Sequence, residues 1–212
     1  MISRTMILSA LLAAVLPSYI LGGVNGAIIT SKMLYRKDIR DYGSGNPGLT
    51  NFYRVFGKGG VLLVVAIDVI KTAAPVLFGG WAFKRAFDMP LLGQTISGFF
   101  VMLGHCFPLL YRFKGGKGVM AAGVIFIVLD WRIAIISWGM FILITALTRY
   151  VSLGAIIGAA LFPPMMLLFD VGGSAEIIIV ALCAVLLIVR HQGNIKRLIS
   201  GSESKFSFRS NR

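Results

Sequence analysis

Residues 60–83 read GVLLVVAIDVIKTAAPVLFGGWAF, an apolar run long enough to cross a bilayer as one α-helix. The chain of 212 residues is 57% hydrophobic and 14% charged, with a mean hydropathy of +0.85. A soluble domain of this size carries far more charge. Apolar runs recur at 5–30, 60–83, 91–111, 118–130, 133–148, 152–169 and 175–190. The pattern predicts an all-α, polytopic integral membrane protein with seven transmembrane helices in a single domain, 1–212.

Three of these runs leave an alternative open. The runs 118–130 and 133–148 are shorter than the ~20 residues that a straight span prefers, and only Asp130-Trp131-Arg132 makes a polar break between them. One kinked span could therefore replace two. The first run follows Arg4 like a signal peptide, but it lacks a small-x-small cleavage site and continues past Pro17. We expect an uncleaved first helix.

The distribution of lysine and arginine predicts the orientation in the membrane. With seven spans, one side holds sixteen basic residues, in 31–59, 112–117, 149–151 and the tail from Arg190, and the other side holds four. Cytoplasmic segments carry such an excess, so the N-terminus is expected outside. The formal charge of +13 then reflects topology and anionic headgroups or substrates, and it does not indicate nucleic acid.

Three glycine-rich segments fall on the same predicted cytoplasmic face. They are GSGNPGLTNFYRVFGKGG (43–60), GHCFPLLYRFKGGKG (104–118) and RHQGNIKRLISGSE (190–203). Glycine lets backbone N–H groups converge on an anion, and hydroxyl, amide and guanidinium groups add donors. Lys117 lies in a Gly-Gly-Lys-Gly turn before a predicted helix start, where free N–H groups favour an anion. A plain interhelical turn is the alternative for that segment, and the Walker A spacing is absent. Together the segments predict phosphate binding.

These segments resemble the motifs of the membrane-embedded acyl-phosphate:glycerol-3-phosphate acyltransferases (the PlsY family) of bacterial phospholipid synthesis. The similarity covers the whole chain, with the motifs in the same order. The first motif is carried by Asp38, Ile39, Gly43, Ser44, Gly45, Asn46, Gly48, Thr50, Asn51 and Arg54. The second is carried by Gly104, His105, Phe107, Pro108, Phe113, Gly115, Gly116, Lys117 and Gly118. The third is carried by Arg190, His191, Asn194, Ile195, Arg197, Leu198, Gly201 and Glu203.

The sequence departs from that family pattern at three places. Leu49 stands where alanine is common, Met120-Ala121 stands where Ala-Thr is usual, and Thr72 follows Lys71 where glycine is frequent. None of these changes removes a charged group or a phosphate donor other than the hydroxyl expected at 121. They therefore bear on fine geometry rather than on the activity.

The resemblance implies that the chain transfers a fatty acyl group from acyl phosphate to the first-position hydroxyl of glycerol 3-phosphate, giving lysophosphatidic acid and inorganic phosphate. The implied catalytic residues are His191, Lys117, Arg54, Asn194, Ser44 and Glu203. The implied phosphate-binding residues are Ser44, Gly45, Asn46, Thr50, Asn51, Arg54, Gly115, Gly116, Lys117, Gly118, His191, Asn194 and Arg197. Glu203 cannot bind phosphate directly, so we expect it to orient Arg54, Arg197 or the substrate hydroxyls.

The general base of this reaction is left open between two candidates. The His-x4-Asp arrangement of many acyltransferases is absent, because Leu110 lies five residues after His105 and Lys196 lies five after His191. Acyl phosphate is already activated, so positioning and charge neutralisation are expected to carry most of the rate. The base is then His191 or a phosphate oxygen of the substrate. His105 is either a packed structural histidine or a ligand.

The implied partners are acyl phosphate, glycerol 3-phosphate and membrane lipid, with no nucleic acid, and the chain is expected to act as a monomer. No cofactor and no metal site are expected. The implied location is the bacterial inner membrane, as a multi-pass protein whose active site faces the cytoplasm. Residues 205–212 are predicted to form a flexible basic tail near anionic lipid.

The apolar runs also contain an acid–base pair and two cysteines, and two other functions are alternatives. Asp68 and Lys71 share a helix face above Pro75, as a functional ion pair or as a packing pair. Cys106 and Cys183 lie in apolar runs and imply packing without a disulfide. The alternative function is an organic-anion or phosphate transporter, although the polar groups gather at one face rather than at the midplane. A phosphatidyl alcohol phosphotransferase would need a carboxylate cluster, and the eight acids are scattered.

Overall fold

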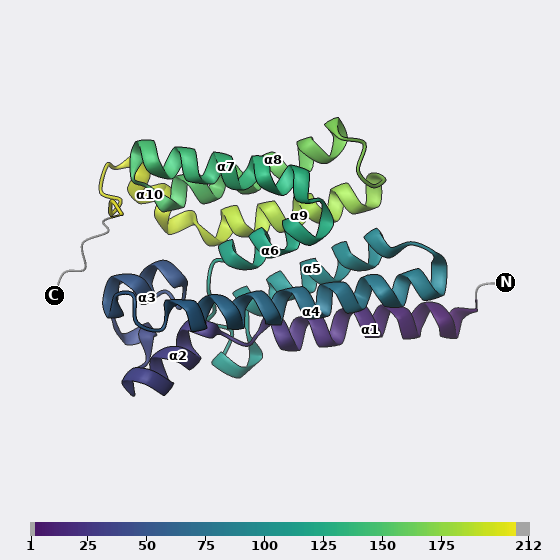
Figure 1. Ribbon diagram of the computed structural model, residues 1–212, viewed down its shortest axis with the longest axis horizontal. Helices are drawn as coiled ribbons and strands as arrows, with labels where there is room; N and C mark the ends of the chain where they lie inside the picture. The colour runs from purple at the N-terminus through teal and green to yellow at the C-terminus, as the bar shows by residue number, and fades with distance from the viewer. Residues whose placement is uncertain (1–2, 207–212) are drawn as a thin grey trace.

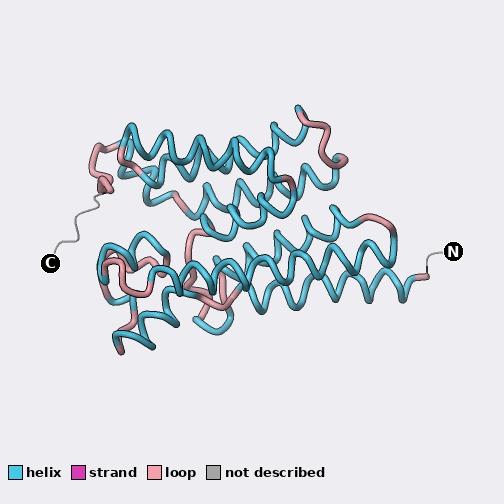
Figure 2. The backbone as a smooth tube through the Cα atoms, viewed as in Figure 1, coloured by secondary structure: helices cyan, strands magenta, loops and turns pink. Residues whose placement is uncertain are grey.

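The computed structural model describes residues 3–206, and this part of the chain is helical with no strand (Figures 1 and 2). The elements are α1 (Arg4–Gly22), α2 (Gly26–Tyr35), η1 (Ile39–Asp41), α3 (Leu49–Phe56), α4 (Val61–Phe87), α5 (Pro90–Cys106), η2 (Leu109–Tyr111), α6 (Val119–Leu129), α7 (Trp131–Thr148), α8 (Val151–Leu168), α9 (Ser174–Arg190) and α10 (Gln192–Ile199). The all-α prediction is confirmed for the described residues. All but two residues of the predicted 205–212 tail lie outside them.

The long helices run side by side in two groups (Figure 1). One group contains α1, α4 and α5, the other contains α7, α8 and α9, and α6 lies between them. A shared apolar core joins the groups, with Met102 of α5, Ile125 of α6 and Leu187 of α9 among its buried members. The short helices α2, α3 and α10 gather at the end of the bundle opposite the N-terminus. The three glycine-rich segments therefore meet at one end.

Many large apolar side chains point outward. Leu62 is 81% exposed, Leu147 is 74% exposed and Leu168 is 72% exposed. Because a continuous apolar surface of this kind is unfavourable in water, the helix exteriors are suited to contact with lipid. Within residues 3–206, five segments are long and apolar enough to cross a membrane: Arg4–Tyr35, Val61–Phe87, Pro90–Tyr111, Trp131–Thr148 and Val151–Leu168.

The count of seven membrane crossings stays a prediction. Helix α9 reaches the required length only together with α10, and the two are bent by 58° where they meet. Helix α6 has 11 residues, which is about 16 Å at 1.5 Å per residue against a hydrocarbon thickness of about 30 Å. Every predicted apolar run nevertheless contains a helix.

The first predicted span, 5–30, is not one continuous helix. Helix α1 ends at Gly22, and α2 begins at Gly26 with Asn25 as its N-cap. The Asn25 side chain accepts a hydrogen bond from the Ile28 N–H (2.9 Å) and donates one to the Pro47 carbonyl (3.0 Å). The Asn25 side chain therefore separates α1 from α2 and joins α2 to the first glycine-rich loop. Hydropathy alone cannot indicate this break.

The kinked-span alternative for residues 118–148 is wrong. Asp130 caps α7 by accepting from the Arg132 N–H (2.9 Å) and the Ile133 N–H (3.2 Å). Trp138 donates from Nε1 to the Gly123 carbonyl of α6 at 3.4 Å. In a continuous helix these residues would be about 22 Å apart, so α7 folds back against α6.

Candidate active site

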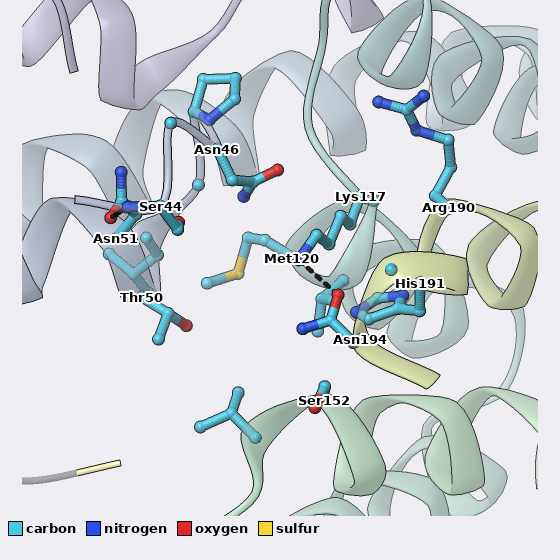
Figure 3. A pocket seen from close by; sticks show the side chains of 18 of the residues that line it. Ser44, Asn46, Thr50, Asn51, Lys117, Met120, Ser152, Arg190, His191 and Asn194 are labelled. Carbon is cyan, nitrogen blue, oxygen red and sulfur yellow. Dashed lines mark hydrogen bonds between the residues drawn. The ribbon is translucent and has the colours of Figure 1, made fainter. Parts of the chain in front are cut away.

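A cavity of about 1070 Å³ lies where the three glycine-rich segments converge. Of the fourteen residues predicted to act in catalysis or phosphate binding, thirteen line it: Ser44, Gly45, Asn46, Thr50, Asn51, Arg54, Gly115, Lys117, Gly118, His191, Asn194, Arg197 and Glu203. The exception is Gly116, where a Cβ would meet the His105 ring. Figure 3 shows the first segment facing the second and third across this space.

The first wall is the loop between η1 and α3. Gly43 and Gly45 have φ angles of +60° and +70°, so two left-handed residues fold the loop back on itself. Asn51 holds this fold: its Oδ1 accepts from the Ser44 N–H (2.9 Å) and its Nδ2 donates to the Tyr42 carbonyl (3.0 Å). Asn51 was predicted to bind phosphate, but both ends of its buried amide are occupied by the loop backbone. Its observed contacts stabilise the conformation of the loop.

The second wall is the turn that precedes α6. Gly118, at φ +85°, ends the turn and starts the helix, so the first N–H groups of α6 lie next to Lys117. The Arg190 guanidinium donates to the carbonyls of Gly116 (3.2 Å) and Gly115 (3.1 Å). These two hydrogen bonds hold the second and third segments in a fixed position relative to each other.

The third wall is the bend between α9 and α10. His191 lies just beyond α9, and its Nδ1 is 2.8 Å from the Leu187 carbonyl. A carbonyl only accepts, so Nδ1 carries the proton and Nε2 is free to accept one. Burial lowers the pKa of His191 to about 4. A neutral histidine with an available Nε2 has the form that a general base requires.

Lys117 and Asn194 connect the second and third walls within the cavity. The Lys117 ammonium donates to Asn194 Oδ1 at 2.7 Å, as the dashed line in Figure 3 marks. Burial lowers the pKa of Lys117. Arg54 is exposed at the first wall, and neither an ion pair nor a hydrogen bond links it to another described residue.

Glu203 is the acid that organises this site. A left-handed Gly201 (φ +70°) returns the chain after α10, and Glu203 accepts hydrogen bonds from Ser152 Oγ (2.7 Å), Asn194 Nδ2 (2.6 Å) and Arg197 Nε (2.7 Å). Burial opposes its charge, but the three hydrogen bonds outweigh that effect and lower the pKa of Glu203. The predicted contact with Arg197 is present.

Ser152 and Arg190 make site contacts that the predicted residue sets omit. Arg190 directly precedes His191 in the third segment, so its position in the sequence could have indicated it. Ser152 gave no such signal, because it opens an apolar run. Only the return of the chain at Gly201 places Glu203 against it.

An apolar groove adjoins the cavity. Val119, Trp138 and Phe141 line both spaces, and the groove continues between α6, α7, α8 and α9 along Phe126, Ala159 and Leu187, among others. The arrangement joins a polar space suited to anions to a small apolar groove between the helices.

The sequence profile of the family described as "Glycerol-3-phosphate acyltransferase" matches residues 12–201. The chain belongs to the glycerol-3-phosphate acyltransferase family. It is similar to the glycerol-3-phosphate acyltransferase of Syntrophotalea carbinolica, with 37% identity over 194 residues, 90% of this chain and 95% of the relative. It is also similar to glycerol-3-phosphate acyltransferase 2 of Bacillus anthracis, with 38% identity over 195 residues, 89% of this chain and 95% of the relative.

Two solved structures share the architecture. Both are crystal structures of PlsY (YgiH), described as an integral membrane glycerol 3-phosphate acyltransferase. The glycerol 3-phosphate form has a TM-score of 0.83 and 30% identity, covering 94% of this chain and 96% of that one. The lysophosphatidic acid form has a TM-score of 0.82 and 29% identity, with the same coverage. The protein is thus an integral membrane acyltransferase with the PlsY fold.

The three departures from the family pattern lie in α3, α4 and α6 of this acyltransferase. Leu49 opens α3 and Met120 lies in the first turn of α6, and both line the cavity (Met120 is labelled in Figure 3). Thr72 is buried and donates from Oγ1 to the Asp68 carbonyl of its own helix at 2.7 Å. Two of the three departures therefore border the site, and the third packs within α4.

Proposed function

We propose that this acyltransferase transfers a fatty acyl group from acyl phosphate to the first-position hydroxyl of glycerol 3-phosphate. The main support is a cavity lined by basic side chains, large enough for two phosphate groups, that adjoins an apolar groove. Both substrates carry phosphate, and only the donor carries a long chain. The alkyl chain would lie in the groove, with both phosphates among the basic side chains.

In the proposed reaction the hydroxyl oxygen of glycerol 3-phosphate attacks the acyl carbonyl carbon. The carbon–oxygen bond to phosphate breaks, the new ester forms, and inorganic phosphate leaves. The hydroxyl proton passes to His191 Nε2 or to a phosphate oxygen. Lys117 and Arg54 would neutralise charge on the phosphates, and the Ser44 hydroxyl and the N–H groups that begin α6 would add donors. Asn194, held by Lys117 and Glu203, would fix the geometry.

We further propose seven membrane crossings, with the cavity facing the cytoplasm and the N-terminus outside. The excess of basic residues at the cavity end supports this orientation. The bacterial inner membrane is the proposed location. A single chain supplies every wall of the cavity, which supports a monomer as the active form.

The test is phosphate release by the purified protein given palmitoyl phosphate, with and without glycerol 3-phosphate, in the absence of coenzyme A. We expect release that depends on glycerol 3-phosphate, with lysophosphatidic acid formed in equal amount. No release from well-folded protein would contradict the proposal, and flux assays for an anion transporter would then follow.

A further inference from the structure

Three ionisable side chains meet below the second wall of the cavity, and the reaction outlined above does not use them. Asp68 and Lys71 belong to α4 and His105 belongs to α5, and they are 4%, 5% and 5% exposed. Lys71 Nζ is 2.9 Å from Asp68 Oδ1 and 2.9 Å from His105 Nδ1, and it also donates to the Val24 carbonyl. Asp68 additionally accepts from the Gly26 N–H at 3.2 Å.

The partners of Lys71 determine the form of the His105 ring. An ammonium group has donors and no acceptor, and Asp68 in contact with it favours the charged form. His105 Nδ1 must therefore accept from Lys71, which leaves the imidazole neutral with its proton on Nε2. His191 has the opposite tautomer, because its Nδ1 donates to the Leu187 carbonyl.

The protonated nitrogen of His105 lies against the turn that precedes α6. A Cβ atom at Gly116 would be only 2.3 Å from Nε2, and the Gly116 N–H donates to the His105 carbonyl at 3.1 Å. His105 also lines the cavity, as Asp68 does. Within residues 3–206, Nε2 has no hydrogen-bond partner, whereas Nδ1 is occupied. A donor at the cavity wall next to Gly116 is thus left without an acceptor among the described residues.

We propose that His105 is a further phosphate-binding residue, whose Nε2–H donates to a substrate phosphate held at the Gly115–Lys117 turn. Lys71 and Asp68 are its positioning residues, because they fix the tautomer that presents this proton. The proposal rests on the proposed function, since that function places phosphate in the cavity. The phosphate of glycerol 3-phosphate and that of the acyl donor offer the same chemistry here.

Two substitutions separate phosphate binding from a purely structural role. In His105→Asn the amide oxygen can replace Nδ1 as the acceptor for Lys71, but nothing replaces Nε2–H. In His105→Gln the amide reaches the Nε2 position, but the acceptor for Lys71 is lost. We expect His105→Asn to keep the wild-type melting temperature and to raise one KM about ten- to a hundredfold. We expect His105→Gln to melt lower and to keep both KM values within about threefold.

The KM that rises identifies the phosphate source, glycerol 3-phosphate or acyl phosphate, and either supports the proposal. Unchanged KM values in His105→Asn would overturn it, as would equal losses in both variants. If the wild type shows no turnover at all, the proposed function fails first, and the kinetic comparison gives way to a binding measurement.

That binding measurement uses the wild-type protein labelled with 15N-histidine, which contains only two histidines. We expect one ring with its proton on Nε2 and one with its proton on Nδ1, the latter assigned to His191 by its loss in His191→Ala. Added inorganic phosphate should shift the Nε2–H signal of His105. A His105 ring protonated on Nδ1, or one indifferent to phosphate, would refute the inference without reference to activity.

Discussion

Lys117 and Asn194 are 77 positions apart in the sequence, and a 2.7 Å hydrogen bond joins their side chains at the cavity wall. Asn194 donates in turn to Glu203, so a basic, a neutral and an acidic side chain form one chain of contacts. Each member holds the next in place. A substitution at the middle should therefore disturb both ends.

Asn194→Ala is expected to lower kcat/KM by roughly a hundredfold, because Lys117 loses an acceptor and Glu203 loses a donor in a partly buried site. Initial rates of phosphate release measure the effect. Gln192→Ala is the matched control, since Gln192 is exposed on the same helix and lies outside the cavity. Equal activity in both variants would show that the contact chain has no part in turnover.

Glu203→Gln tests the charge of the acid while it keeps the shape of the side chain. The folded-state pKa of Glu203 is lowered, so its charge stabilises the folded protein above the ordinary pKa near 4.5, and that contribution disappears as pH falls through the folded-state value. The difference in melting temperature between wild type and Glu203→Gln should be constant from pH 6 to 8 and shrink toward acid. A difference that grows toward acid would contradict this assignment.

The activity that depends on His191 should persist well below neutral pH. Its pKa of about 4 keeps the ring neutral at pH 5, where an unperturbed histidine is mostly protonated. The ratio of wild-type to His191→Ala activity cancels the ionisation of the substrates, and it should stay level from pH 8 to about pH 5. If this activity ratio halves near pH 6.5, the pKa of His191 is not lowered by burial as the structure indicates. If the wild type is only a few times more active than His191→Ala, His191 is not the sole base.

Gly123→Ala is expected to loosen the packing of α6 against α7, because a Cβ there would be 2.3 Å from Trp138. Overpacking of this kind costs about 1–3 kcal/mol, so the melting temperature should drop by several degrees. The KM for palmitoyl phosphate should rise as well, since both residues line the groove. Gly139→Ala in α7 is the control, because nothing lies within 4 Å of its Cβ. Similar melting temperatures for the two variants would refute the packing argument.

Hydropathy was sufficient to locate α1 and the helices α4 to α9, because each apolar run needs a helix to satisfy its backbone in lipid. Charge distribution and glycine content likewise indicated which segments would share one end of the bundle. Hydropathy did not indicate the interruption at Asn25, which depends on a hydrogen bond to Pro47 across the first loop. Short elements such as α2 and α10 also depend on contacts of this tertiary kind.

The candidate site shows a similar division. Residue types in the three segments and the family resemblance together pointed to groups that the structure brings into one cavity, such as Lys117 and His191. Roles were harder to assign, because they depend on which partners already occupy a side chain. Asn51 is occupied by its own loop, and Ser152, from an apolar run, lines the cavity and donates to Glu203. A single sequence does not show either contact.

The shortness of α6 has a consequence for how the substrates meet. Helices α6 and α7 share an end at Asp130, and α6 has 11 residues against 18 in α7, so α6 starts about 10 Å short of the other end of α7. The turn that we propose to hold phosphate therefore lies below the end of α7 on the cavity side. If the site lay at the end of the bundle, the acyl chain would have to leave the bilayer to reach it. Each methylene group exposed to water would then cost about 0.8 kcal/mol of free energy. In the proposed reaction the small, water-soluble substrate would move down to the turn, and the acyl chain would stay within the hydrocarbon layer.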